Sequence, residues 1–198
     1  MKPQQHQGIE GLLNLPSPLD SVFKNTEDLP LFFDNLMYGM VELLRCDRCY
    51  LYIRDPQLQT YQIPHCYCVH PEIPNLVQAR SDTESYYRQE SDPLFAAAMS
   101  GAPHIYIEDT EKLFYSNDNC AFWQQNYLEH KALIQAHIFI DGELWGIIQA
   151  AQYDRSRPWT KFDRGLISQI VDKITPLVAV YVKRQLRGNV QYLHDGDR

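Results

Sequence analysis

Four of the five cysteines lie in one short stretch of the chain, and their spacing could support metal chemistry. Cys46 and Cys49 form C-x2-C, sixteen residues follow, and Cys66 and Cys68 form C-x-C. Four thiolates at one end of a hairpin would suit zinc or an iron–sulfur cluster. The alternative is that these cysteines are small apolar residues packed near a sheet edge. We favour packing, because C-x-C is a weaker ligand spacing and its two cysteines share one strand face.

The stretch "ALIQAHIFIDGELWGIIQAAQ" places polar side chains inside two apolar runs. Asp141-Gly142 is a strong signal for a two-residue hairpin turn. The turn would pair Ile138 with Trp145 and Ile134 with Gln149. Both faces of this hairpin are apolar, so we expect central strands that are covered on both sides.

Aromatic side chains concentrate in the mid-chain segments that would cover one face of this hairpin. The functional interpretation is a pocket for a planar ligand. The alternative is that the aromatic side chains fill the space and leave no cavity. The predicted ligand-contacting residues are Phe95, Tyr106, Trp123, Ile134, Trp145 and Gln149. His137 is interpreted as a core histidine rather than a ligand.

The remaining pattern alternates helices with hairpins, which favours an α+β fold with an antiparallel sheet. Apolar residues at helical spacing predict a helix that starts at residue 26, and Asp92-Pro93 predicts the start of a second. A third helix should begin at a Thr160–Asp163 capping box and kink or split at Pro176. Residues 70–91 are interpreted as a loop. We assign an N-terminal extension (1–25), one domain (26–188) and a C-terminal tail (189–198).

Composition excludes several classes of protein. The chain has 198 residues, 44% of them hydrophobic, and a formal net charge of −7. A net acidic chain is a poor general binder of nucleic acid. We find no run near the roughly 18 apolar residues of a membrane span and no signal peptide. An odd number of cysteines without an export signal indicates reduced thiols and a cytoplasmic protein.

Four segments in order resemble the GAF domain family. They are "LFFDNLMYGMVELLRCDRCYLYIRD", "DPLFAAAMSGAPHIYIED", "ALIQAHIFIDGELWGIIQA" and "RPWTKFDRGLISQIVDKITPLVAVYV". The "LWG" and "RPW" elements are similar to GAF domains of cyanobacterial proteins. The resemblance implies a central antiparallel sheet, with long terminal helices on one face and short helices and loops over a pocket on the other. It also implies homodimerisation through the terminal helices.

Departures from the family's known sites narrow the function. Bilin-binding members carry a Cys-His pair, where this chain has Cys120-Ala121, and a histidine where it has Ala151. We therefore expect no covalent bilin, and no cofactor. The signature of cyclic-nucleotide-binding members is missing, and "FAAAMSGAP" lacks the cysteine of the methionine sulfoxide reductases.

We therefore expect a stand-alone, non-catalytic regulatory or interaction module that acts by dimerising or by binding an unidentified protein partner. The first alternative is a sensor of a small molecule or a metal. The second is a thiol-dependent enzyme of the methionine sulfoxide reductase type.

Overall fold

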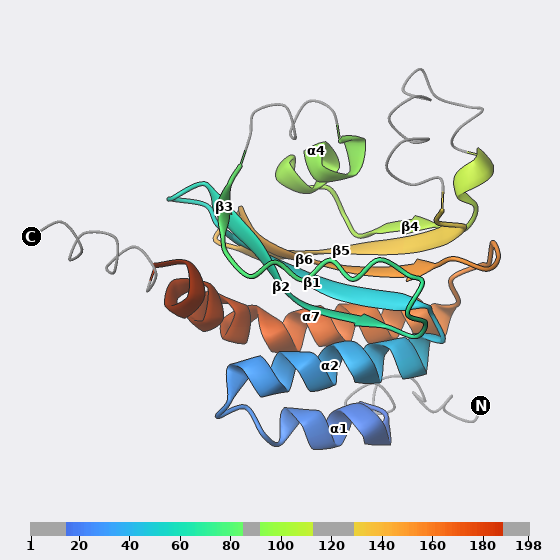
Figure 1. Cartoon of the computed structure of the whole chain (residues 1–198), viewed down its shortest axis with the longest axis horizontal. Coiled ribbons are helices and arrows are strands. Elements are labelled where there is room, and N and C mark those ends of the chain that lie inside the picture. Colours follow the sequence, from blue (N-terminus) through green and yellow to red (C-terminus); the bar gives the residue numbers. More distant parts are fainter. Residues whose placement is uncertain (1–14, 85–91, 113–128, 188–198) are drawn as a thin grey trace, which may run out of the picture.

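A computed structural model describes residues 15–84, 92–112 and 129–187. Their centre is a six-stranded antiparallel sheet with the strand order β3-β2-β1-β6-β5-β4 (Figure 1). The strands are β1 Arg48–Asp55, β2 Thr60–Cys68, β3 Asp82–Thr83, β4 Ile105–Ile107, β5 Ala132–Ile140 and β6 Glu143–Gln152. The predicted α+β class is confirmed. Strand β3 lies within the segment that we expected to be a loop.

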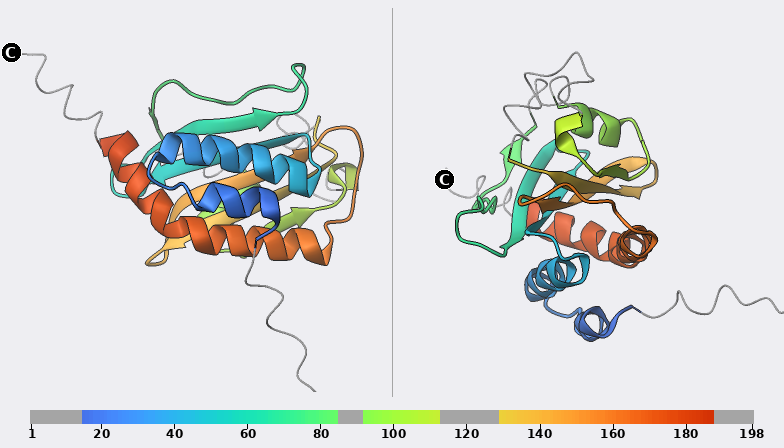
Figure 2. Two further views of the ribbon diagram at one scale, coloured as in Figure 1. Left: turned by 90° about the horizontal axis from the view of Figure 1, so that it is seen from below. Right: turned by 90° about the vertical axis from the view of Figure 1, so that its right-hand side faces the viewer.

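Helices cover both faces of the sheet. They are α1 Ser17–Phe23, α2 Leu29–Leu44, α4 Pro93–Met99 and α7 Lys161–Val182, which continues as a π-helical turn, Lys183–Arg187. Helices α2 and α7 lie on one face and α4 lies on the other, with α1 outside α2 (Figures 1 and 2). This is the layer arrangement that the sequence resemblance implies.

The helix starts are set by side-chain caps. Asp28 accepts a hydrogen bond from the backbone N–H of Leu31 at the start of α2. Asp92 caps α4, and Pro93 occupies the first helical position. Thr160 and Asp163 form the predicted capping box at α7. Each cap satisfies backbone donors that have no partner inside the helix, so short polar signals fix these boundaries.

Pro176 neither divides α7 nor ends it. The helix continues to Val182, although proline removes one backbone hydrogen bond. Ile174 and Val178, on either side of it, are fully buried in the core beneath the sheet. Burial of the apolar stripe on both sides of the proline therefore outweighs the lost bond, and the expected split is wrong.

The helix from Lys161 to Arg187 is also long and apolar enough to cross a membrane, by length and composition alone. The sequence pattern did not reveal it as a candidate, since charged residues interrupt the run. A core helix passes the same test, and the buried residues of α7 pack against the sheet.

The hairpin between β5 and β6 begins as predicted and then shifts by one residue. Asp141 and Gly142 both have positive φ, at 53° and 82°, as a type I′ turn requires. Farther along, Ile138 pairs with Gly146, so Trp145 is an extra residue in β6. The expected pairs of Ile138 with Trp145 and of Ile134 with Gln149 are therefore wrong. A bulge moves all later side chains of a strand to the opposite face.

The two faces of the sheet differ in chemistry. The helix face, covered by α2 and α7, is apolar and includes Cys49, Leu51, Ile53, Ala132, Ile134, Ala136, Ile138, Ile148 and Ala150. The α4 face carries Tyr50, Tyr52, Leu133, Gln135, His137, Phe139, Ile147, Gln149 and Ala151. Apart from Asp55 and Gln152 at the strand ends, the buried polar side chains of β1, β5 and β6 thus lie on the α4 face.

Part of the segment that we assigned to an N-terminal extension packs on the domain. Leu19 of α1 is fully buried, and its Cδ2 lies 2.6 Å from where a Cβ on Gly39 would stand. Glycine at this position lets α1 approach α2 closely. Residues 15–23 therefore add a further layer outside α2.

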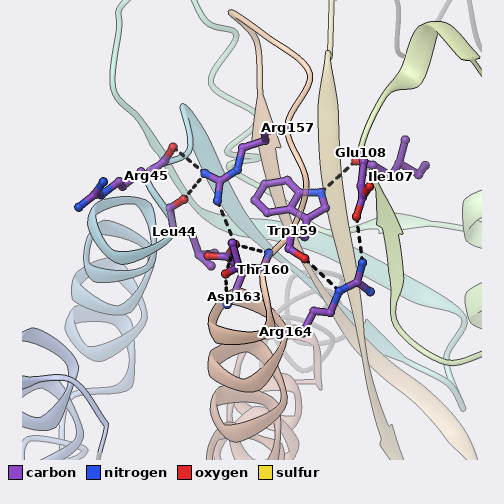
Figure 3. A network of polar contacts seen from close by, with 9 residues as sticks. All are labelled: Leu44, Arg45, Ile107, Glu108, Arg157, Trp159, Thr160, Asp163 and Arg164. Atoms are coloured by element: carbon purple, nitrogen blue, oxygen red, sulfur yellow. Dashed lines mark hydrogen bonds and ion pairs between the residues drawn. The ribbon is translucent and has the colours of Figure 1, made fainter.

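Arg157 joins the ends of three elements (Figure 3). Its guanidinium donates to the carbonyl oxygens of Leu44 (2.6 Å) and Arg45 (3.2 Å) and to Asp163 Oδ2 (3.0 Å). It also lies over the ring of Trp159, whose indole N–H donates to Ile107 O. The "RPW" element thus caps the C-terminus of α2, holds the start of α7 and fixes β4.

We predict that Arg157→Ala lowers the free energy of unfolding by about 2 kcal/mol, because it leaves buried acceptors and the Asp163 carboxylate without their partner. Arg155→Ala is the matched control. Arg155 is exposed, with a single 3.9 Å ion pair, so its loss should change stability by less than about 0.5 kcal/mol. Urea unfolding followed by circular dichroism measures both, and equal effects would contradict this role for Arg157.

Candidate functional site

The α4 face is built around a stripe of alternate residues on β1. Arg48, Tyr50, Tyr52 and Arg54 share this face, since side chains alternate along a strand. Tyr50 pairs with Gln149 of β6, and Tyr52 pairs with Ile147. Phe95 of α4 packs edge-on against Tyr52, with ring centroids 5.9 Å apart. The stripe therefore places aromatic rings at the centre of the face and a guanidinium at each end.

Two buried polar side chains of β5 hold the α4 segment to the sheet. The Gln135 amide donates to Leu94 O (2.8 Å) and to His137 Nε2 (3.1 Å). His137 Nδ1 donates to Ala102 O (2.9 Å), and its backbone N–H donates to His104 Nδ1 (3.1 Å). This pattern requires a neutral His137 that carries its proton on Nδ1. Gln135 and His137 thus fasten both ends of α4.

Burial keeps these histidines uncharged. Desolvation lowers the pKa of His137, and the nearby His104 lowers it further, while the bond to Ala102 partly opposes the change. Desolvation also lowers the pKa of His104. Both rings are therefore neutral near pH 7, as their acceptor roles demand. The core-histidine interpretation of His137 is consistent with this geometry.

Gln149 differs from its neighbours on the α4 face. Its side chain is 2% exposed and stands between Gln135 and Tyr50 in the strand register. Unlike Gln135 and His137, it is not one of the side chains that hold α4. Its amide lies beside the aromatic rings of β1, where a ligand on the α4 face would meet it.

A buried ion pair occupies the β3 end of the same face. Arg54 Nε donates to Glu84 Oε1 (2.7 Å), and the Tyr52 hydroxyl donates to the same oxygen (2.8 Å). Arg54 also donates to Leu144 O, and Tyr61 stacks on Tyr52. The other carboxylate oxygen of Glu84 is buried without a hydrogen-bond partner. The sequence analysis missed this pair.

A second buried cluster occupies the opposite end of the face. Arg48 donates to His130 Nε2 (2.8 Å) and to Pro74 O (3.1 Å). The Tyr153 hydroxyl is 3.1 Å from the same His130 nitrogen, and the guanidinium lies against the Tyr153 ring. Burial, only partly offset by Arg48, raises the pKa of Tyr153. The sequence held one signal of these clusters: Arg48 and Arg54 are an even number of residues apart, which places both on the same face of a strand.

The predicted ligand-contacting residues do not meet in one place. Phe95 and Gln149 lie on the α4 face. Ile134 and Trp145 belong to the helix-face core, and Tyr106 pairs with Ile134 and contacts Arg164 of α7. Trp123 lies outside the described residues. The extra residue at Trp145 separates Gln149 from Ile134, so a pocket lined by all these side chains is not what the fold builds.

The four cysteines divide between the two faces. Cys46 and Cys49 are buried in the helix-face core, whereas Cys66 and Cys68 pair with Tyr50 and Arg48 on the α4 face. Among the described residues, no group of three or more His, Cys, Asp or Glu side chains is arranged to hold a metal. The alternative four-thiolate arrangement is not formed, because β1 and β2 pair Cys49 with Tyr67.

The environment of these thiols disfavours the thiolate. Burial raises the pKa of Cys46 to about 12 and that of Cys49 well above its ordinary value. Burial, and then Cys66, raises the pKa of Cys68 to about 12. A nucleophilic cysteine needs the opposite shift. Cys120, the position compared with the bilin-attachment site, lies outside the described residues, and Ala151 is buried at the end of β6.

Two hollows open on the described surface. One, of about 860 Å³, lies between α1 and α2 and is lined in part by Val22, Leu31 and Tyr38. The other, of about 530 Å³, lies at the end of the sheet beside Pro74 and Tyr153. The first is lined by polar and charged side chains together with two exposed apolar ones, Leu31 and Tyr38, and the second is lined mainly by carboxylates.

We predict that the free energy of unfolding falls as the pH is lowered from 7 to 5. The folded chain resists protonation of His137, so the unfolded chain binds more protons below its ordinary pKa of 6.5. The free energy of unfolding keeps falling until the pH reaches the lowered pKa of His137 in the folded chain. This group contributes at most about 1.4 kcal/mol of that fall per pH unit. Urea unfolding at several pH values should give a shallower dependence for His137→Gln. An unchanged slope would show that this histidine is protonated freely in the folded chain.

Comparison with known proteins agrees with this architecture. The GAF domain family model matches residues 28–175. No curated protein matches the chain.

Three solved structures share the fold. The GAF domain of an Acinetobacter phosphoenolpyruvate-protein phosphotransferase is 11% identical, with a TM-score of 0.61 over 82% of this chain and 90% of that one. A phycoerythrobilin-bound GAF domain from a cyanobacterial phytochrome is 17% identical, with a TM-score of 0.62 over 89% and 100%. The blue-light absorbing form of the Thermosynechococcus elongatus PixJ GAF domain is 20% identical, with a TM-score of 0.55 over 90% and 98%. The matched family model and this shared fold show that the chain belongs to the GAF domain family.

Proposed function

We propose that this GAF domain is a non-catalytic regulatory module that acts as a homodimer through its helical layer. The observation that carries the proposal is the hollow along α2, whose lining includes the exposed side chains of Leu31 and Tyr38. These residues are 57% and 48% exposed and lie two helical turns apart. Exposed apolar side chains gathered along a groove are typical of a protein interface.

The chemistry of the described side chains supports the absence of catalysis. Gln135 and His137 are occupied in holding α4, and the cysteine thiols with shifted pKa values are held protonated. These particular groups are therefore not activated nucleophiles of the kind that a reaction site needs. Free thiols at four described cysteines support a reducing, cytoplasmic setting.

We take a second copy of the chain as the occupant of the exposed groove. A twofold axis would place the grooves of the two subunits opposite each other, so each contact residue would occur twice in the interface, once from each subunit. Phe162 and Val180 of α7, in the same helical layer, are also exposed apolar side chains, at 54% and 42%. An unidentified protein partner could use the same groove, and a regulatory signal would then pass through that contact.

We predict that the protein elutes at twice its 23.2 kDa chain mass and that Tyr38→Glu weakens the dimer at least tenfold. Two buried charges per dimer cost more than about 1.4 kcal/mol in total, which is a factor of ten in affinity. Val77→Glu is the control, because Val77 is 50% exposed and lies outside the helical layer. Size-exclusion chromatography with light scattering over a range of concentrations measures both variants.

A monomer at every concentration would overturn the homodimer. Dimers of equal strength in both variants would place the interface elsewhere.

We infer a second candidate function, a small-molecule sensor, from the amide of Gln149. This group is buried beside the aromatic rings of the α4 face. A planar ligand that stacks on these rings could hydrogen-bond to it. The GAF domain of a cyanobacterial phytochrome is phycoerythrobilin-bound, although the sequence here argues against covalent attachment of a bilin to this chain.

We predict that, if this second function holds, freshly purified protein retains a non-covalent small molecule. Native mass spectrometry and the absorption spectrum would detect it. Gln149→Leu should reduce its occupancy about tenfold, the effect of losing one buried hydrogen bond. Gln169→Leu on α7, across the sheet, is the control. Protein without any retained molecule, or equal occupancy in the two variants, would remove this candidate.

A further inference from the structure

Cys66 and Cys68 form a pair of adjacent thiols on β2. Their Sγ atoms are 3.8 Å apart, because residues two apart on a strand share a face. Both side chains are half-buried. Strand β3 pairs with β2 only at Thr60 and Tyr61, so no described strand covers the outer edge of β2 beside the two thiols. The pair is therefore reachable from solvent.

The separation of the two sulfurs fits a bridging metal ion better than a disulfide. Two thiolates at about 2.3 Å from one tetrahedral zinc ion lie about 3.8 Å apart. A disulfide would instead need residues whose Cα atoms are at most about 6.8 Å apart, and two steps along a strand already span about 6.4 to 6.8 Å. A disulfide would therefore lie at the upper limit of this range and would have to draw the two sulfurs from 3.8 Å to about 2.05 Å, whereas an ion could enter without moving the strand.

The surroundings of the pair favour a cation reaching it. Cys68 Sγ lies 3.7 Å from Pro74 O, and Pro74 lines the hollow of about 530 Å³ at the end of the sheet. The carboxylates that line this hollow are those of Asp47, Glu72, Glu129 and Asp154, and Lys131 is the cationic side chain among the described lining residues. An acidic rim concentrates cations from solution.

Arg48 supplies the balancing charge on the other side. It pairs with Cys68 across β1 and β2, and its positive charge lowers the pKa of Cys68 against the larger raising effects of burial and of Cys66. Its Nε is buried without a hydrogen-bond partner. A Cu⁺ dithiolate carries one net negative charge, which this guanidinium would offset, whereas a Zn²⁺ dithiolate is neutral.

We propose that Cys66 and Cys68 form a two-thiolate site for one thiophilic d10 metal ion, Zn²⁺ or Cu⁺. Each thiol loses its proton to solvent, two metal–sulfur bonds form, and no electron is transferred. The described residues supply two ligands only, so the remaining positions of a tetrahedral ion are open to water or to an added ligand. Soft thiolate ligands select these ions over Mg²⁺ or Ca²⁺.

The test is a titration of reduced, metal-free protein with Zn²⁺ against a chromophoric chelator, and with Cu⁺ under argon against bicinchoninate. We expect one ion per chain and the release of two protons, measured by calorimetry in buffers of different ionisation enthalpy. Cys66→Ser and Cys68→Ser should each weaken binding at least tenfold. Cys49→Ala is the control, since Cys49 lies on the opposite face. Preference for one ion identifies which of the two fits.

A second readout needs no variant and is independent of folding effects. In the natural chain, the bound ion should slow alkylation of Cys66 and Cys68 by iodoacetamide at least tenfold, as measured by peptide mass mapping. Binding that survives the Cys66→Ser/Cys68→Ser double substitution, or alkylation at the unprotected rate with both ions tested, would overturn the proposal.

Discussion

Coverage of both faces of the central strands is the constraint on which the rest of this structure depends. Strands β1, β6 and β5 lie inside the six-stranded sheet, with α2 and α7 on one side and α4 on the other. Any polar side chain in these strands must find a partner inside the protein, since water cannot reach it. Gln135 and His137 meet this demand with carbonyl oxygens at the two ends of α4. Their polarity therefore positions α4 rather than serving catalysis.

The sequence predicted those parts of the fold that are specified locally. The caps Asp92 and Thr160 and the Asp141-Gly142 turn each act within a few residues, so their chemistry is visible in the chain. The extra residue at Trp145 is not visible, because both faces of β6 are apolar. A strand without alternation gives no sign that its side chains have changed faces. One undetected residue was enough to separate Gln149 from Ile134 in the candidate site.

The buried charges were unpredictable for a different reason. Arg48 and Arg54 in "RCYLYIR" are the kind of residue that is usually exposed, yet each is about 95% buried. Their partners are remote in sequence: His130 is 82 residues from Arg48, and Glu84 is 30 residues from Arg54. Only the three-dimensional contacts show that these guanidiniums are compensated. The arrangement of the cysteines was unpredictable for the same reason, since the pairing of β1 with β2 decides which thiols share a face of the sheet.

The helices on the two faces of the sheet are held with unequal strength, and this difference matters for regulation. The helix face buries long apolar stripes of α2 and α7, whose packing resists local change. The seven-residue helix α4 is held by a small apolar contact and by hydrogen bonds to Gln135 and His137, each worth only about 1 kcal/mol. Local opening begins where few contacts must break. A ligand or ion on the α4 side would therefore stabilise the weaker layer, and the helical layer would remain a constant surface for a partner.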